Sequence, residues 1–185
     1  MKPKYIAIAA ITLDGKIAKD KKHLSNWTSR EDKIFMRALL DKCDVIIVGN
    51  NTYKTAKGPL SKRNCIVFSR SVNKLISKSV KLVYCNPKKV DVKKLIRDRG
   101  YKRIAILGGA QTYSYCLKNK MLDELYLTIE PLVFGSGINL FDECILDKKS
   151  RPTEILKKFW RVKLISIKKL NRKGSLLLHY NRDQK

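Results

Sequence analysis

The feature that most constrains the fold of this chain is an alternation of short apolar runs with longer amphipathic segments. The apolar runs cover residues 5–11, 44–49, 65–68, 81–84 and 103–107. Runs of this length and composition are typical of strands that are buried on both faces of a sheet. The segments with helical patterns and end signals are residues 29–40, 90–99 and 110–119. This alternation predicts an α/β fold of three layers, with a mainly parallel central sheet and helices on both faces.

The last third of the chain has a different pattern. Residues 123–129 form one more predicted strand, which a glycine-containing loop follows. Two further strands, at 159–169 and 175–180, are separated by Asn171-Arg172-Lys173-Gly174, a sequence typical of a hairpin turn. We therefore expect an antiparallel C-terminal hairpin beside the parallel sheet.

Composition narrows the class of protein. The chain has 185 residues and 44% hydrophobic content, which suits a single domain over residues 1–185. No apolar run approaches the roughly 18 residues that a membrane-spanning helix needs, and the first residues lack a secretory cleavage pattern. The five cysteines include no CxxC pair. This usage favours reduced thiols in a cytoplasmic protein over a disulfide framework or a zinc site, and no metal is expected.

The net charge of +25 comes from 41 lysines and arginines against 16 aspartates and glutamates. An excess of this size is expected of proteins that bind nucleic acid. The lysines are nevertheless spread along the chain, with no basic tail and no basic stretch interleaved with aromatic residues. A solvated lysine-rich surface, or a basic cleft for an anionic small molecule, is favoured. A basic nucleic-acid-binding protein is kept as the remote alternative.

Ligands of open α/β sheets bind where strands end and helices begin, and three such junctions have a suitable composition. The first is Gly49-Asn50-Asn51-Thr52, and the second is Gly108-Gly109-Ala110-Gln111-Thr112. The third is Ser69-Arg70, where a hydroxyl and a guanidinium could hold a phosphate. A cap, a tight turn or a solvated loop explains each junction equally well on its own. The GxGxxG dinucleotide motif is absent.

Acid–base candidates are few. Glu31 and Asp32 begin a predicted helix shortly after Trp27, and the amino end of a helix favours an anion. A carboxyl behind an indole in an apolar cleft can have a raised pKa and relay a proton, although an ordinary first-turn acid is the simpler interpretation. No G-x-S-x-G elbow, phosphate-binding GxxxxGK[ST] loop or HExxH motif occurs, which excludes those chemistries.

Four blocks in chain order resemble dihydrofolate reductase and its relative, the reductase domain of riboflavin biosynthesis. Ile8 to Ala18 is similar to the family's first strand and to its mobile loop over the nicotinamide. Val48 to Tyr53 is similar to its G-x-x-T-[WY] turn, and Ile106 to Tyr113 to its Gly-Gly turn. Asp123 to Thr128 is similar to the strand that follows. The resemblance runs from Ile6 to about Tyr180 and implies the dihydrofolate reductase-like fold.

Resemblance to dihydrofolate reductase implies catalytic roles for a few residues. The relay carboxylate of that enzyme lies five positions after a tryptophan, as Asp32 does after Trp27, with Glu31 as an alternative. Thr128 matches the threonine that hydrogen-bonds this carboxylate. Arg63, which follows a Pro-Leu pair, matches the arginine that holds the tail of folate.

The same resemblance implies NADPH as the cofactor and 7,8-dihydrofolate as the substrate, which is reduced to tetrahydrofolate by hydride transfer. The two glycine-containing turns would hold the dinucleotide, with Ser69 and Arg70 at its 2′-phosphate. Ala10 and Ile17 would line the nicotinamide pocket. The residues expected around the pterin are Ile8, Phe35, Leu60 and Leu107.

The closest alternative is the 2,5-diamino-6-ribosylamino-4(3H)-pyrimidinone 5′-phosphate reductase of riboflavin biosynthesis. Thr12 to Ala18 is closer to that family's S-L-D-G-K-I-A, and Ser25 to Ser29 resembles its S-x-W-I-T. Against it, Leu107 stands where that family usually has glutamate, and Thr55 to Leu60 lacks the paired acids of its D-D-P-x-L-T-x-R stretch. Arg63 would then hold a sugar phosphate. Either a monomer or a homodimer is compatible with these relatives.

Overall fold

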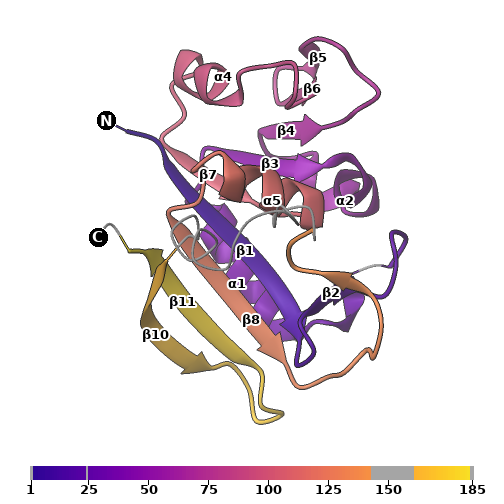
Figure 1. Cartoon of the computed structure of the whole chain (residues 1–185), viewed down its shortest axis with the longest axis vertical. Helices are drawn as coiled ribbons and strands as arrows, with labels where there is room; N and C mark the ends of the chain where they lie inside the picture. Colours follow the sequence, from indigo (N-terminus) through magenta and orange to yellow (C-terminus); the bar gives the residue numbers. More distant parts are fainter. Residues whose placement is uncertain (1, 24, 143–160, 184–185) are drawn as a thin grey trace, which may run out of the picture.

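The computed structural model describes residues 2–23, 25–142 and 161–183 (Figure 1). The strands are β1 (Lys4–Thr12), β2 (Lys16–Ala18), β3 (Val45–Gly49), β4 (Cys65–Phe68), β5 (Ile76–Ser79), β6 (Leu82–Cys85), β7 (Arg103–Ile106), β8 (Glu124–Glu130), β9 (Ile138–Asn139), β10 (Val162–Lys169) and β11 (Leu176–Arg182). The helices are the 3₁₀ turn η1 (Ser25–Trp27), α1 (Arg30–Leu40), α2 (Asn50–Thr55), α3 (Lys57–Leu60), α4 (Val92–Asp98) and α5 (Ala110–Lys118).

The central sheet has the order β10-β11-β8-β1-β7-β3-β4-β6-β5. Its middle is parallel: β1 pairs with β7 and β8, and β3 pairs with β4 and β7. At one edge β11 is antiparallel to both β8 and β10, and at the other β5 is antiparallel to β6. The predicted fold class is thus confirmed. The continuous apolar runs form the central strands, and the last two predicted strands form the antiparallel hairpin.

Helices cover both faces of the sheet, and each face has its own apolar core. Tyr5 and Ala7 of β1 point toward α4 and α5, while Ile6 and Ile8 point toward α1, α2 and α3. Alternation of side chains along a strand produces this division. Both faces of the middle strands are therefore buried, as their lack of polar alternation predicts.

The helix starts follow local signals. Ser29 caps α1 with its side-chain oxygen, which accepts a hydrogen bond from the Asp32 backbone N–H at 3.3 Å. Asp91 caps α4 in the same way through the backbone N–H of Lys94. The sequence does not predict the short elements β2, β5, β9 and α3, because they show no period and lack the continuous apolar run that marks the equally short β4.

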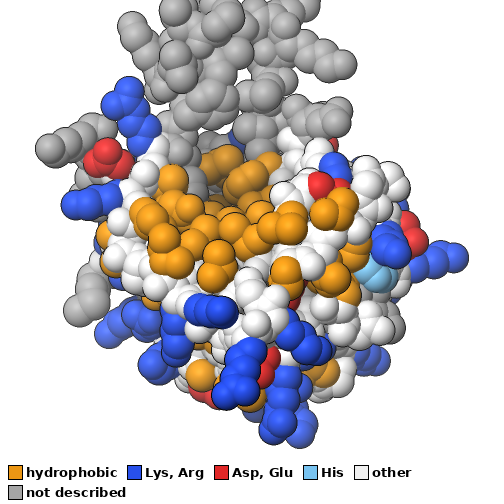
Figure 2. Space-filling model, turned by 90° about the horizontal axis from the view of Figure 1, so that it is seen from below, with side chains coloured by type: hydrophobic (Ala, Val, Ile, Leu, Met, Phe, Trp, Pro, Cys, Tyr) orange, Lys and Arg blue, Asp and Glu red, His pale blue; other side chains and the backbone are white. Residues whose placement is uncertain are grey.

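The hairpin forms the outer edge of the sheet. Its strand β10 begins at Val162 among the described residues, and residues 159–160 of the predicted strand lie outside them. The side chains of Leu164, Ile165 and Ile167 on β10 are exposed. Figure 2, which views the molecule from below, shows hydrophobic side chains gathered in one area, and most of the lysines and arginines in this view lie below that area in the picture.

Two expectations from composition can be compared with the structure. Within the described residues no helix is long and apolar enough to cross a membrane. Cys43, Cys65, Cys85 and Cys116 are free thiols, and Cys144 lies outside the described residues. Burial raises the pKa of Cys65 to about 11 and that of Cys85 to about 12, so both behave as apolar core residues.

Candidate active site

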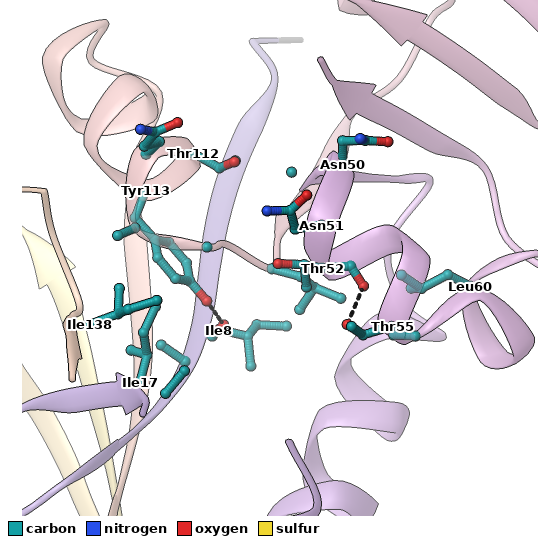
Figure 3. A pocket seen from close by; sticks show the side chains of 18 of the residues that line it. Ile8, Ile17, Asn50, Asn51, Thr52, Thr55, Leu60, Thr112, Tyr113 and Ile138 are labelled. Carbon is teal, nitrogen blue, oxygen red and sulfur yellow. Dashed lines mark hydrogen bonds between the residues drawn. The ribbon is translucent and has the colours of Figure 1, made fainter. Parts of the chain in front are cut away.

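A cleft of about 1500 Å³ lies at the carboxyl ends of the parallel strands β1, β3, β4 and β7. Its walls come from α1, from the starts of α2 and α5, and from β2 and β9. Figure 3 shows Ile8, Asn51, Thr52 and Tyr113 around this space, with Ile17 and Ile138 at one side. This is the edge at which open α/β sheets bind ligands.

Two of the predicted turns meet at one point of the cleft. The backbone N–H of Gly49 donates to the carbonyl of Gly108 at 2.7 Å, because β3 and β7 are neighbours in the sheet. A Cβ on Gly49 would lie 3.0 Å from Thr112 Oγ1. Any residue other than glycine at this position would therefore require a small shift of the Thr112 side chain. The helices α2 and α5 begin at these turns, and no side chain caps either of them. Their first N–H groups are therefore free to bind an anion.

The Gly-Gly turn has the tightest backbone of the site. Gly108 has a φ of +81°, and a Cβ there would lie 2.4 Å from the ring of Tyr113. The peptide bond between Gly108 and Gly109 is cis. Tyr113 is buried, and its hydroxyl donates to the carbonyl of Ile8 at 2.6 Å, which links α5 to the middle of β1 (Figure 3).

We expect Tyr113→Phe to lower the free energy of unfolding by about 1–3 kcal/mol, because the buried carbonyl of Ile8 loses its donor. Chemical denaturation of the two proteins measures this difference. Tyr101→Phe, at a partly exposed tyrosine, is the control and is expected to change stability little. Equal losses in the two variants would show that the Tyr113 hydrogen bond is not the cause.

The third predicted junction follows β4. Ser69 is buried, and its hydroxyl lies 2.6 Å from that of Ser71 and also accepts the Ser71 backbone N–H. Arg70 is exposed at the rim of the cleft. This turn thus offers one ordered hydroxyl pair and one cation at the same side as the glycine turns.

Asp32 is the acid that the structure places in the cleft. It lies in the first turn of α1 with 6% of its surface exposed. Burial raises the pKa of its carboxyl and the negative charge of Glu130 adds to this, while hydrogen bonds from Thr128 and Thr28 and the charge of Lys33 act in the opposite direction. A carboxyl in this setting holds its proton to a higher pH than an exposed aspartate and can act as an acid.

The alternative acid, Glu31, lies on the outer surface. Its carboxylate accepts a hydrogen bond from Asn171 Nδ2 at 3.2 Å, and its pKa is lowered, mainly by a hydrogen bond from its own backbone and then by that of Asn171. It does not line the cleft. Trp27 does line it and packs edge-to-face on Phe134.

Helical spacing decides which side chains of α1 reach the cleft. Asp32, Met36 and Leu40 line it at intervals of four residues. Phe35 was expected at the substrate, but it faces the sheet and packs on Tyr126 with ring centroids 5.4 Å apart. The position predicted for Phe35 is therefore corrected: Met36, the next residue of α1, lines the cleft and Phe35 does not.

Cations gather at the mouth of the cleft beside α1 and α3. Lys33, Arg37, Lys62 and Arg63 all line it. Arg63 forms an ion pair with Asp41, with 2.5 Å between Nη2 and Oδ1. The sequence analysis assigns a role to Arg63, and the presence of Lys33 and Arg37 of α1 beside it is a finding of the structure.

The segment after β1 is tied to the loop that follows β8. The Asp14 carboxylate accepts the backbone N–H groups of Phe134 and Gly135 at 3.1 and 2.9 Å. The Thr12 hydroxyl, together with these N–H groups, holds the pKa of Asp14 below its usual value. Strand β2 then pairs with β9, which brings Ile17 and Ile138 to the same wall of the cleft.

Most of the residues predicted for the site line this one cleft. They are Ile8, Ala10, Ile17, Trp27, Asp32, Gly49, Asn50, Asn51, Thr52, Leu60, Arg63, Ser69, Arg70, Leu107, Gly109, Ala110, Gln111 and Thr112. Gly108 and Thr128 lie directly behind its wall, where they contact Tyr113 and Asp32. No group of three or more His, Cys, Asp or Glu residues in the described ranges could hold a metal ion.

Comparison with known proteins identifies a family whose model matches this chain, a similar protein and solved structures that share the fold. The dihydrofolate reductase family model matches residues 4–133. The uncharacterized protein YwjB of Bacillus subtilis is 28% identical over 159 residues, which cover 82% of this chain and 90% of that protein.

Two solved structures share the fold. A pyrimidine reductase-like protein from Corynebacterium diphtheriae has a TM-score of 0.74 and 16% identity, covering 99% of this chain and 93% of that one. A diaminohydroxyphosphoribosylaminopyrimidine deaminase/5-amino-6-(5-phosphoribosylamino)uracil reductase from Thermotoga maritima has a TM-score of 0.72 and 16% identity. The alignment covers 98% of this chain and 57% of the Thermotoga chain.

Proposed function

Because the chain belongs to the dihydrofolate reductase family, we propose that it is an NADPH-dependent reductase and that its substrate is a phosphoribosylaminopyrimidine. This substrate replaces dihydrofolate as the first choice. The observation that carries it is the likeness, over almost the whole chain, to proteins whose names describe pyrimidine reductases.

The cofactor end of the cleft fits a dinucleotide phosphate. The uncapped starts of α2 and α5 supply backbone donors, and the glycines leave space that a Cβ would fill. Ser69 and Arg70 add a hydroxyl and a guanidinium for a 2′-phosphate. Bound NADPH supplies the hydride. Ala10 and Ile17 line the wall where they would exclude water from the nicotinamide.

Reduction of a ribosylamine needs an acid as well as a hydride. The hydride adds to C1′ of the sugar, the bond from C1′ to the ring oxygen breaks, and that oxygen takes up one proton. Asp32 is the buried acid of the cleft and has a raised pKa, so we assign it this proton. Thr128 and Thr28 hold its carboxyl in place through their hydrogen bonds.

The cations at the mouth suit the phosphate of the substrate. Arg37, Lys62 and Arg63 line this end, and a phosphate dianion attracts all three. Arg63 already pairs with Asp41, which makes it a poor dedicated anchor for the carboxylate of a folate tail. Several cations together bind a phosphate dianion more strongly than one arginine, which is already paired with an aspartate, binds a carboxylate.

Dihydrofolate remains the second candidate on one observation. Asp32 and Thr128 lie together as the relay pair of dihydrofolate reductase would, with Trp27 lining the same cleft. In that case Asp32 would promote protonation of the pterin N5, and Leu60 and Leu107 would contact the ring.

We expect Arg70→Ala to raise the Kd for NADPH by about tenfold to 100-fold and to leave that for NADH unchanged, because the 2′-phosphate loses a charged donor. Titration of the protein with each nucleotide, followed by tryptophan fluorescence, measures both constants. Arg99→Ala, at an exposed arginine after α4, serves as the control. If the binding of both nucleotides weakened equally, Arg70 would not be the residue that binds the 2′-phosphate.

The proposed function is tested by following NADPH oxidation at 340 nm with purified protein. The phosphoribosylaminopyrimidine and dihydrofolate are run in parallel. We expect turnover of the pyrimidine alone. Turnover of dihydrofolate alone would make the second candidate correct. Absence of turnover with both substrates, in a protein that binds NADPH, would contradict the proposed reaction.

A further inference from the structure

Glu130, the last residue of β8, is a buried carboxylate that no sequence motif had indicated. Only 3% of its surface is exposed. One carboxylate oxygen accepts the backbone N–H of Ser29 at 2.7 Å, and the other accepts the Ser175 hydroxyl at 2.5 Å. Among the described residues it forms no ion pair with a lysine or arginine. Its negative charge is thus held by two hydrogen bonds and by the amino end of α1.

The hydrogen bonds of Glu130 belong to a network that extends into the turn of the C-terminal hairpin. The Ser175 hydroxyl accepts from Asn171 Nδ2 at 2.9 Å, and the Ser175 backbone N–H donates to Asn171 Oδ1 at 3.2 Å. Asn171 also donates to Glu31 on α1. Glu130 therefore stands at the junction of β8, the hairpin turn and the first turn of α1.

This junction lies directly behind the proposed proton donor. Ser29, whose backbone Glu130 binds, caps α1 through the N–H of Asp32. Thr128, which hydrogen-bonds the Asp32 carboxyl, precedes Glu130 by two residues on β8. Residues two apart on a strand point to the same face. One face of β8 thus holds the Asp32 carboxyl through Thr128 and the start of its helix through Glu130.

We propose that Glu130 is a positioning residue for Asp32: it fastens the amino end of α1 to β8 and to the hairpin turn before β11, and it faces Asp32 with a second buried negative charge. This inference rests on the proposed function for the role of Asp32 as proton donor. The coupling between the two carboxyls is a property of the protein alone and can be measured without substrate.

The groups that face Asp32 come from three elements. They are Glu130 and Thr128 on β8, Lys33 and the preceding Thr28 at α1, and the uncharged hydroxyl of Tyr113 on α5. A second negative charge at a buried site disfavours the ionised form of Asp32. The charge of Glu130 therefore raises the pKa of Asp32 and that of Lys33 lowers it, with burial as the larger cause.

The test uses Glu130→Gln, in which an amide of the same shape replaces the charge. Ser175→Ala is the second variant, because it removes one hydrogen bond and keeps the charge. Glu124→Gln is the control: Glu124 is another buried glutamate of β8, but it pairs with Lys4 at the opposite end of the strand. The readout is the ¹³C shift of the Asp32 carboxyl carbon against pH in the substrate-free protein, assigned by its loss in Asp32→Asn.

We expect the titration midpoint of Asp32 to fall in Glu130→Gln by about half a unit to one unit. The decline of kcat at high pH should move to lower pH by the same amount, because the acid form is lost earlier. In Ser175→Ala the midpoint stays near that of the wild type while kcat falls. Glu124→Gln changes neither quantity.

An unchanged midpoint in Glu130→Gln overturns the inference, whether or not the protein is a reductase. An unchanged kcat in Ser175→Ala overturns the positioning role of the network. A shifted midpoint in a protein that reduces neither substrate supports the coupling of the two carboxyls and contradicts only the proposed function.

Discussion

Gly108→Ala is expected to abolish dinucleotide binding and to lower the free energy of unfolding by about 2–5 kcal/mol. Two effects add. The φ of +81° disfavours any residue with a Cβ, and the new Cβ would lie 2.4 Å from the ring of Tyr113. Tyr113 cannot move aside freely, because it is buried and bonded to the Ile8 carbonyl. The turn itself must therefore shift, and it carries the start of α5.

Gly100→Ala separates the two effects. Gly100 has a similar φ of +68°, but a Cβ there would meet nothing within 4 Å. It should lose about 1–2 kcal/mol of stability from the backbone alone and should bind NADPH like the wild type. Denaturation and nucleotide titration of both variants measure this. Equal stability losses, or tight NADPH binding by Gly108→Ala, would contradict the role assigned to the Gly-Gly turn.

Asp32→Asn is expected to lower kcat by about 100-fold to 10 000-fold, because the reaction loses its general acid while the cleft keeps its shape. The KM for NADPH should be unchanged, since Asp32 belongs to α1 and not to the glycine turns that we assign to the dinucleotide. Asp98→Asn, at an exposed ion pair with Lys94 on α4, is the control and should keep full activity. A variant that retains both the rate and the pH profile of the wild type would remove Asp32 from the reaction.

Asp32→Asn lowers the activity, but we expect it to stabilise the folded protein relative to the wild type at high pH. The pKa of Asp32 is higher in the folded protein than in the unfolded chain, so the wild type loses stability as pH rises from the unfolded value toward the folded one. Asparagine has no such titration. Asp32→Asn should therefore become more stable than the wild type above this range and lose that advantage at low pH. Urea denaturation at a series of pH values measures the difference, and a difference that does not change with pH would contradict the raised pKa.

The central strands could be predicted from sequence because burial on both faces leaves a direct signature. The apolar runs at β1, β3, β4 and β7 contain almost no polar residues, and the helix predicted over residues 29–40 begins within one residue of α1. The strands β2, β5 and β9 could not be predicted, because tertiary contacts rather than local pattern specify such short strands.

The residues of the site likewise divide into those that the sequence could predict and those that it could not. The glycine turns and Asp32 could be predicted because each follows a local signal that the resemblance then places in order. Glu130 could not, since its partners Ser29 and Ser175 are distant in the chain and an isolated glutamate in a strand has no motif. The choice between Phe35 and Met36 could not be made either, because both share the face of Asp32 by spacing and only the rotation of α1 against the sheet separates them.

Transfer of deuterium from NADPH deuterated at nicotinamide C4 tests the account most directly. The protein, the labelled cofactor and the phosphoribosylaminopyrimidine are incubated, and the product is examined by mass spectrometry and NMR. We expect one deuterium at C1′ of an open-chain ribitylamine, formed by the wild type and almost absent with Asp32→Asn. A pyrimidine without label, beside a dihydrofolate sample that gains one deuterium at C6, would contradict it.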